Sequence, residues 1–199
     1  MPIDPGLIET LRRDIVFEAE LVGRRFLFHS TWGLFSPKEI DEGTRLLLRH
    51  IEVGRDDRCL DLGCGYGPIG IALAAAAPEG EALLVDKDFV AVEYARKNLK
   101  LNGVKNASAF LSNGFSHIPP GKRFSLIASN IPAKAGKELL TLWFYDSWLR
   151  LEPGGRLYVV AISGLRRFLK RCLTEIFGNY EKVKQGSHYT VSLAVKEPR

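Results

Sequence analysis

The chain has 199 residues, of which 46% are hydrophobic and 26% are charged, and its formal net charge is +5. This length and composition are typical of a globular protein that folds without disulfides. No apolar run reaches the roughly 18 residues that span a bilayer, and the first residues, MPIDPGLIET, lack the basic and apolar regions of a signal peptide.

The N-terminal part is predicted to form a helix and then a hairpin. Residues 7–13 fit a short helix. In the stretch DIVFEAELVGRRFLFH, the side chains alternate with the period of two that is typical of strands, and Val22-Gly23 fits a turn. We therefore expect a β-hairpin over residues 14–29, followed by the loop STWGLFSPK.

From Glu39 onward, helical and strand patterns alternate. The first helical repeat should end near Gly54, and a later helix is opened by Pro68, whose missing N–H costs nothing in a first turn. Asp88 can cap the next helix, which should end at Asn102-Gly103. The expected strands between and after these helices are RCLDL, EALLV, ASAFL, FSLIAS and RLYVVA.

Two further helices and a closing hairpin complete the pattern. One helix is expected over 136–151, with Leu139, Leu142, Trp143 and Trp148 as its apolar side chains, and another over 165–177. The segments YEKVKQ and YTVSLAV then face each other across Gly186-Ser187. This order predicts a doubly wound, Rossmann-like α/β fold. Its mostly parallel sheet would have about seven strands with one antiparallel edge strand, and the N-terminal β-hairpin would precede it. We expect a single domain over 1–199, with the extension 1–38 packed on it.

Four polar side chains follow predicted strand ends. Because the carboxyl ends of parallel strands meet at one edge of a sheet, where ligands bind at the switch point, we expect these side chains to lie close together. They are Asp61, Asp86, Asn113 and Asn130.

The segment DLGCGYG joins a strand to a helix, so its glycines allow a ligand to approach the backbone closely. Gly65, Gly67 and Gly70 also match the dinucleotide pattern G-x-G-x-x-G, and an acidic residue such as Asp86 is expected in either case. Asp61 favours another ligand, since its negative charge suits an amino or sulfonium group better than a pyrophosphate.

The segments LDLGCGYG, LLVDKD, SNGF and SNIPAKAGKELL resemble class I S-adenosylmethionine-dependent methyltransferases. Together with WGLFSPKEIDEGTRLLL and GSHYTVSLAVK, they are similar to the small-domain methyltransferases, a family that includes ribosomal RNA small subunit methyltransferase C, a guanine N2-methyltransferase. This resemblance implies the cofactor S-adenosyl-L-methionine.

The resemblance also implies where the cofactor binds. Its methionine end would be surrounded by Asp61, Gly63, Cys64, Gly65 and Gly67. Asp86 would bind the ribose hydroxyls with Lys87 beside it. Asn113 would contact the adenine edge, unless it serves only as a turn residue. Phe35 and Ser36 would belong to a loop that closes over the site. Asp41 could line the site or simply cap the following helix.

The catalytic residues implied by the resemblance are Asn130, Ile131 and Pro132. The lone pair of an exocyclic amine is delocalised into its ring, and two acceptors on its N–H bonds would free that lone pair. The Asn130 side-chain oxygen and the Ile131 carbonyl would be those acceptors, and Pro132 would hold Ile131 extended. Ile131 replaces the family's usual first proline. Ala133 replaces an aromatic residue, so stacking of the base would fall to Phe35, Phe115 or Trp32.

These features predict a cytoplasmic N-methyltransferase whose acceptor is a guanine amine in small-subunit ribosomal RNA. The acceptor could instead be a protein glutamine, and the chain could be a cofactor-binding module without turnover or, more distantly, an NAD-linked oxidoreductase. The expected partner is ribosomal RNA or the small ribosomal subunit, gripped by the hairpin and by basic pairs such as Arg166-Arg167, and a homodimer could assist. We expect no membrane partner. We also expect no metal, because His29, His50, His117 and His188 share no ligand spacing.

Overall fold

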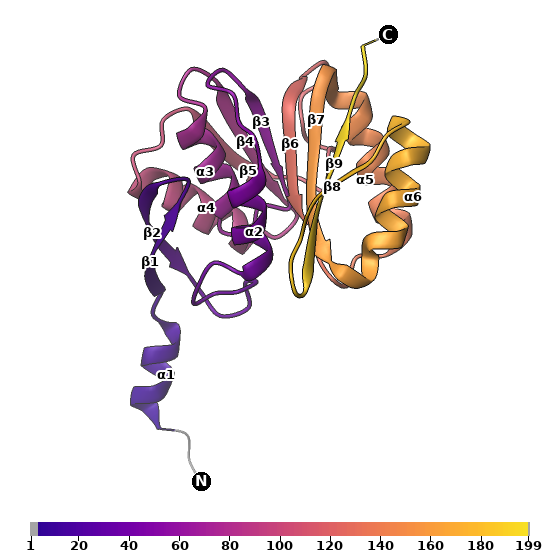
Figure 1. The fold of residues 1–199 in the computed structure, drawn as a ribbon. Helices are drawn as coiled ribbons and strands as arrows, with labels where there is room; N and C mark the ends of the chain where they lie inside the picture. Colours follow the sequence, from indigo (N-terminus) through magenta and orange to yellow (C-terminus); the bar gives the residue numbers. More distant parts are fainter. Residues whose placement is uncertain (1–3, 199) are drawn as a thin grey trace.

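The structure is a computed structural model that describes residues 4–198, and its centre is a seven-stranded sheet (Figure 1). The strand order is β5-β4-β3-β6-β7-β9-β8. Only β9 runs antiparallel to its two neighbours, so the closing hairpin forms the antiparallel edge with β8 outermost. The predicted fold class is therefore confirmed. The strands are β3 (Arg58–Leu62), β4 (Glu81–Asp86), β5 (Ala107–Leu111), β6 (Phe124–Asn130), β7 (Leu151–Ile162), β8 (Glu181–Gln185) and β9 (Tyr189–Val195).

Helices cover both faces of the sheet (Figure 1). One apolar core lies beneath α2 (Glu42–His50), α3 (Pro68–Ala76) and α4 (Phe89–Leu101), and a second lies beneath α5 (Lys137–Arg150) and α6 (Arg166–Phe177). A short 3₁₀ turn, η1 (Ser163–Leu165), joins β7 to α6. Alternate residues of β7 supply the two cores, with Tyr158 on one side and Leu157 and Val159 on the other, as the period of a strand requires.

The structure can be compared with the predicted start of one helix, the predicted start of one strand and the predicted apolar face of another helix. As expected if Asp41 caps it, α2 begins at Glu42, where the Asp41 carboxylate accepts the N–H groups of Gly43 and Thr44. The strand expected from Arg156 begins at Leu151, where its pairing with β6 has a register shift. The predicted apolar face of α5 is wrong in part, since Leu142 is 60% exposed while the helix buries Leu140, Trp143, Phe144 and Ser147.

The predicted N-terminal hairpin is present as β1 (Ile15–Leu21) and β2 (Arg24–Ser30), which form a separate two-stranded sheet. The outer edge of β2 is paired with side chains of α4. Asn102 Oδ1 accepts the Leu27 N–H at 2.9 Å, and its Nδ2 donates to the Leu27 carbonyl at 2.8 Å. Asn98 does the same with His29, at 2.8 and 2.9 Å. Asn98 Nδ2 also donates to the Tyr66 carbonyl at 2.9 Å, which ties the hairpin to the glycine loop.

The helix α1 (Pro5–Arg12) is capped by Asp4 and buries none of its residues. In Figure 1 it extends beyond the hairpin, away from the body of the protein. No helix within residues 4–198 combines the length and apolar character needed to cross a membrane. Cys59, Cys64 and Cys172 are all buried free thiols.

Candidate active site

The ends of β3, β4, β5 and β6 lie side by side at one rim of the sheet, because these four strands are consecutive in it. Hydrogen bonds tie their ends together. The Ser112 N–H donates to the Asp86 carbonyl at 2.8 Å, and the Ser129 hydroxyl donates to the Leu62 carbonyl at 2.6 Å. The residues that follow these strands, from the glycine loop to Asn130, therefore surround one site.

The glycine loop between β3 and α3 presents Gly65 toward open space. The N–H groups of Gly63 and Cys64 both donate to the Val85 carbonyl, at 2.9 and 3.0 Å, so they are already satisfied. Gly65 has a φ of +54°, and a Cβ there would meet no atom within 4 Å. The open side of the loop thus leaves room for a ligand close to the backbone.

Asp61 lies beneath this loop and is completely buried. Its Oδ2 accepts the Gly70 N–H at 2.7 Å, and its Oδ1 is buried with no hydrogen-bond partner among the described residues. Burial, reinforced by the nearby charge of Asp86, raises the pKa of Asp61 to about 7 against the opposing Gly70 hydrogen bond. An unpartnered buried carboxylate oxygen favours a positively charged neighbour, so this position fits the ammonium group of S-adenosylmethionine.

Asp86 and Lys87 end β4 beside the same loop. Asp86 Oδ2 accepts the Gly65 N–H at 2.9 Å, and Oδ1 accepts the Asp88 N–H at 3.0 Å. Each oxygen keeps a second lone pair, so the half-buried carboxylate can still accept from two ribose hydroxyls. Lys87 is exposed.

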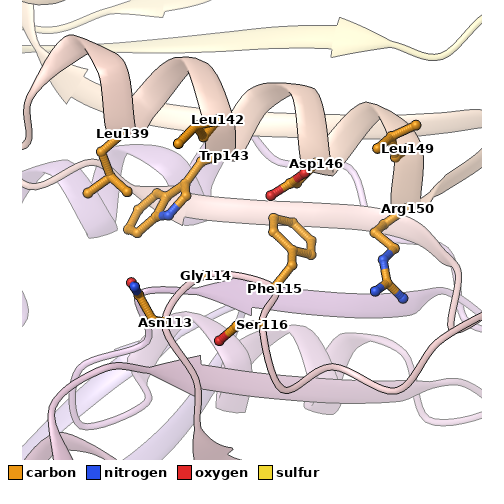
Figure 2. Close-up of a pocket in the computed structure, with 10 residues that line it drawn as sticks. All are labelled: Asn113, Gly114, Phe115, Ser116, Leu139, Leu142, Trp143, Asp146, Leu149 and Arg150. Atoms are coloured by element: carbon orange, nitrogen blue, oxygen red, sulfur yellow. The ribbon is translucent and has the colours of Figure 1, made fainter.

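A cavity of about 450 Å³ lies between α5 and the loop that follows β5 (Figure 2). Asn113 enters it from the loop, facing Trp143 on the helix (Figure 2). Trp143 also reaches the glycine loop, since its ring carbon Cη2 lies 3.8 Å from where a Gly63 Cβ would stand. The volume and the mixture of aromatic and amide groups suit a flat heteroaromatic ring.

The loop before α2 lies over the glycine loop. The Tyr66 hydroxyl is 3.2 Å from the Ser36 carbonyl and 3.1 Å from the Glu39 carbonyl. Phe35, between these anchors and Trp32, is 66% exposed, and Trp32 is 47% exposed with the Lys38 ammonium over its ring. Phe115, the third stacking candidate, packs in the core beneath α5 and also lines the cavity between α5 and the loop after β5 (Figure 2).

Asn130 ends β6, one strand away from the glycine loop. Its Nδ2 donates to Asp41 Oδ2 at 2.8 Å and to Thr44 Oγ1 at 3.0 Å. No group in residues 4–198 donates to its Oδ1, which is not buried. The amide therefore has its donor end occupied and its acceptor end available. Of the two roles considered for Asp41 from the sequence, the structure confirms that it caps α2, and it adds the contact with Asn130.

Ile131 and Pro132 continue the chain from Asn130. The Ile131 N–H donates to the Val160 carbonyl at 2.8 Å and its side chain is buried, so the residue is anchored although it is not proline. Within residues 4–198 its carbonyl accepts no hydrogen bond. Two free acceptors therefore stand next to each other, while Pro132 and Ala133 are exposed.

Four residues beside the site were not predicted as site residues. They are Thr44, Tyr66, Trp143 and Tyr189. The ring of Tyr189 lies against Gly43, where a Cβ would stand 2.8 Å from it. Thr44, Tyr66 and Tyr189 lie within segments that carry the family resemblance, WGLFSPKEIDEGTRLLL, LDLGCGYG and GSHYTVSLAVK, which was the signal available in the sequence.

Exposed basic side chains flank the Asn130 side of the rim. They stand after the ends of β6 and β7, at the beginnings of α5 and α6, and include Lys134, Lys137, Arg166, Arg167 and Lys170. Lys134, Arg167 and Lys170 make no ion pair within the described part of the chain. No group of three or more His, Cys, Asp or Glu side chains in residues 4–198 could hold a metal ion.

Comparison with known proteins identifies relatives of this chain. The model of the methyltransferase small domain matches residues 25–192. The uncharacterized protein YbxB of Bacillus subtilis is 33% identical over 88% of this chain and 89% of its own. Ribosomal RNA large subunit methyltransferase G of Streptomyces avermitilis is 35% identical over 89% of this chain, which spans only 47% of it.

A solved structure with the same fold carries a ligand. It is a T. thermophilus 16S rRNA N2 methyltransferase in complex with AdoMet and guanosine, 29% identical with a TM-score of 0.83. The match covers 92% of this chain and 50% of that one. The present chain thus spans about half the length of these two ribosomal RNA methyltransferases.

Proposed function

Because the chain belongs to the methyltransferase small domain family, we propose that it methylates the exocyclic amine of a guanine in ribosomal RNA. The prediction of an S-adenosylmethionine-dependent methyltransferase is confirmed at the level of family and cofactor. The acceptor is the proposed part. Its main support is the pair of uncommitted acceptors, Asn130 Oδ1 and the Ile131 carbonyl, beside the glycine loop.

The cofactor site is assigned to the residues that the sequence indicated. Asp61 and the loop Gly63, Cys64, Gly65 and Gly67 would hold the methionine end, with Gly65 giving the closest approach. Asp86 would accept from the ribose and Lys87 would flank it. Asn113 and Trp143 would hold the adenine in their cavity, and Phe35 would cover the site from its anchored loop. Bound S-adenosylmethionine supplies a methyl group already activated on a sulfonium.

The chain's own contribution is to orient the amine. Asn130 Oδ1 and the Ile131 carbonyl would each accept one N–H of the guanine amino group, which directs its lone pair toward the methyl carbon. Such preorganised contacts are worth about 10²–10³ in rate, and alignment of the reacting atoms adds to this. As the new N–C bond forms, the bond between the methyl carbon and the sulfonium would break and leave a neutral thioether, and the proton lost from the nitrogen would pass to water at the exposed rim.

Ribosomal RNA is the favoured acceptor for two reasons. The basic side chains at the beginnings of α5 and α6 follow the ends of β6, which Asn130 ends, and of its neighbour β7, so they can meet phosphates that flank the target base. The related 16S rRNA methyltransferase holds guanosine in its solved complex. Relatives of this chain are named as methyltransferases of the large subunit and of the small subunit. We propose the small subunit, and the experiment below distinguishes the two.

The test is transfer of labelled methyl groups from S-adenosylmethionine to naked 16S and 23S RNA, to assembled subunits and to protein, followed by mapping of the modified residue. We expect label on N2 of a guanine in small-subunit RNA, and loss of about 10²–10³ in turnover in Asn130→Ala with retained cofactor affinity. Label in glutamine side chains would replace RNA by protein as the acceptor. Cofactor binding without transfer to any fraction would indicate a binding module, and wild-type turnover in Asn130→Ala would refute the catalytic assignment.

A further inference from the structure

The amide of Asn130 has two ends of similar shape, and only the oxygen end can accept a hydrogen bond from an amine. Its surroundings determine which end faces the ligand. An ionised carboxylate can only accept, so the group 2.8 Å from Asp41 Oδ2 must be the amide NH₂. Thr44 Oγ1 accepts the second hydrogen of the same NH₂ at 3.0 Å. We infer that Asp41 and Thr44 are positioning residues that fix the polarity of the Asn130 amide, an inference that rests on the proposed function.

Asp41 is itself held in place by the beginning of α2. Its Oδ1 accepts the Gly43 N–H at 2.8 Å, and its Oδ2 accepts the Thr44 N–H at 3.2 Å. The carboxylate therefore cannot rotate away from Asn130 without uncapping the helix. Thr44 is only 3% exposed, so water cannot easily replace its hydroxyl as the second acceptor.

Gly43 explains why this turn can come so close to the site. A Cβ at this position would stand 2.8 Å from the ring of Tyr189 and 3.0 Å from Asp41 Oδ1. A side chain there would push α2 away from β9 and move the carboxylate with it. Each residue of the motif Asp-x-Gly-Thr thus has its own function. Asp41 caps the helix and accepts one N–H of Asn130, Gly43 leaves room for the ring of Tyr189, and Thr44 accepts the other N–H of Asn130.

The consequence concerns the reacting amine, which offers only N–H donors to its acceptors. If the Asn130 amide were reversed, its NH₂ would face those donors and repel them. Hydrogen bonds to an ionised group are about twice as strong as neutral ones, so the carboxylate contributes most to the preference for the productive orientation. Asp41 never touches the ligand in this scheme and acts only through Asn130.

The decisive variant is Asp41→Asn. Asparagine caps helices as well as aspartate does, so α2 keeps the shorter capping hydrogen bond, from the Gly43 N–H, through the new Oδ1 and loses only the longer one from the Thr44 N–H. The NH₂ of the new side chain then faces Asn130 and favours the reversed amide. We expect kcat for methyl transfer to RNA to fall about 100-fold or more, with the dissociation constant for S-adenosylmethionine within about twofold of wild type. Asp4→Asn, which changes a capping aspartate with no contact to the site, is the matched control and should keep wild-type turnover.

Thr44 gives a second, independent test in case Asp41→Asn folds poorly. Thr44→Val keeps the shape but removes the neutral acceptor, so turnover should fall by about two- to tenfold. Thr44→Ser keeps the hydroxyl and should restore most of it. Equal turnover in the valine and serine variants would contradict a role for this hydroxyl.

A double-mutant cycle separates positioning from a general structural role. In an Asn130→Ala background there is no amide to orient, so adding Asp41→Asn should cost less than about threefold in kcat. Losses that multiply, or wild-type kcat in Asp41→Asn, would overturn the inference. Failure of the proposed function looks different, because Asn130→Ala alone would then remain fully active. An inactive Asn130→Ala beside a fully active Asp41→Asn would refute only the positioning role.

Discussion

The contact between α3 and β4 gives the sharpest structural prediction, through Gly70→Ala. Gly70 is the third residue of α3, and its N–H donates to Asp61 beneath the glycine loop. A Cβ at this position would overlap Cγ of Leu84 most closely and would stand 2.6 Å from both of its methyl carbons, and Leu84 is completely buried in β4. Carbon atoms in contact lie about 3.5–4.0 Å apart, so either the helix must shift by roughly 1.5 Å or the Leu84 side chain must move.

The expected cost follows from this overlap. Extra methyl groups in a packed core cost about 1–3 kcal/mol, and a weakened Asp61 hydrogen bond adds about 1 kcal/mol, which the better helix propensity of alanine offsets. For a chain of this size each kcal/mol lowers the melting temperature by about 2–4 °C. Gly70→Ala should therefore lower it by about 2–12 °C, as measured by thermal unfolding followed by circular dichroism.

Two further variants make this prediction refutable. Gly164→Ala is the control, since a Cβ there meets no atom within 4 Å, and its melting temperature should stay within about 2 °C of wild type. Leu84→Ala removes the two methyl groups that Gly70→Ala would strike, so the double variant should lose at least about 1 kcal/mol less than the sum of the single losses. Additive losses, or a Gly70→Ala protein as stable as wild type, would show that α3 and β4 are not closely packed.

Three further predictions concern the site. The raised pKa of Asp61, about 7, means that the folded protein holds a proton there which the unfolded chain releases from about pH 4 upward. Stability of the ligand-free protein should therefore fall as pH rises from 4.5 to 7.5, and Asp61→Asn, which resembles the protonated acid, should flatten this fall in urea titrations. Replacing Arg166 and Arg167 by alanine should weaken RNA binding and lower the slope of log affinity against log salt by about one to two. Ala133→Phe should restore a stacking surface and lower the KM for RNA by about fivefold or more.

Each of these has an outcome that would contradict it. Parallel stability curves for wild type and Asp61→Asn would mean that Asp61 ionises normally in the folded state. An unchanged salt slope in the double arginine variant would move the RNA path away from α6. An unchanged KM in Ala133→Phe would show that the base does not lie against that position.

The architecture could be predicted from the sequence because its signals are local. Mostly apolar strands alternate with helices, and the glycine loop marks the switch point, so the sheet and its polar rim follow from residues close together in the chain. The exposed face of α5 could not be predicted, because polar and apolar side chains are mixed along its segment without a clear helical period. Leu142 was consequently placed on the wrong side.

The site could be predicted only as a set of strand ends. The contact that orients Asn130 joins it to Asp41, 89 residues earlier, and depends on α2 beginning beside β6. The sequence indicated that Asp41 could cap a helix, because a cap involves only residues close together in the chain. The contact of Asp41 with Asn130 joins distant parts of the chain and could not be predicted in this way. The site role of Trp143 could not be predicted for a similar reason. The sequence indicated an apolar side chain on a helix, but not that this side chain reaches the glycine loop.

The pairing of β2 with α4 has a geometric limit of its own. Four residues of helix advance about 6.0 Å, and two residues of strand advance about 6.6 Å, so amides spaced one turn apart can imitate a neighbouring strand. A further asparagine four residues along the helix would lie about another 0.6 Å out of line with the strand, and its side chain would be rotated by about another 40° around the helix axis. Asn98 and Asn102 are the two positions at which the spacing of helix and strand agrees. One turn earlier, the Tyr94 hydroxyl donates instead to Asp14, which precedes β1. The two asparagine amides of α4 thus occupy the hydrogen-bonding groups at this edge of β2, so another chain cannot pair with them. The difference in spacing also limits the length of hairpin that the helix can hold.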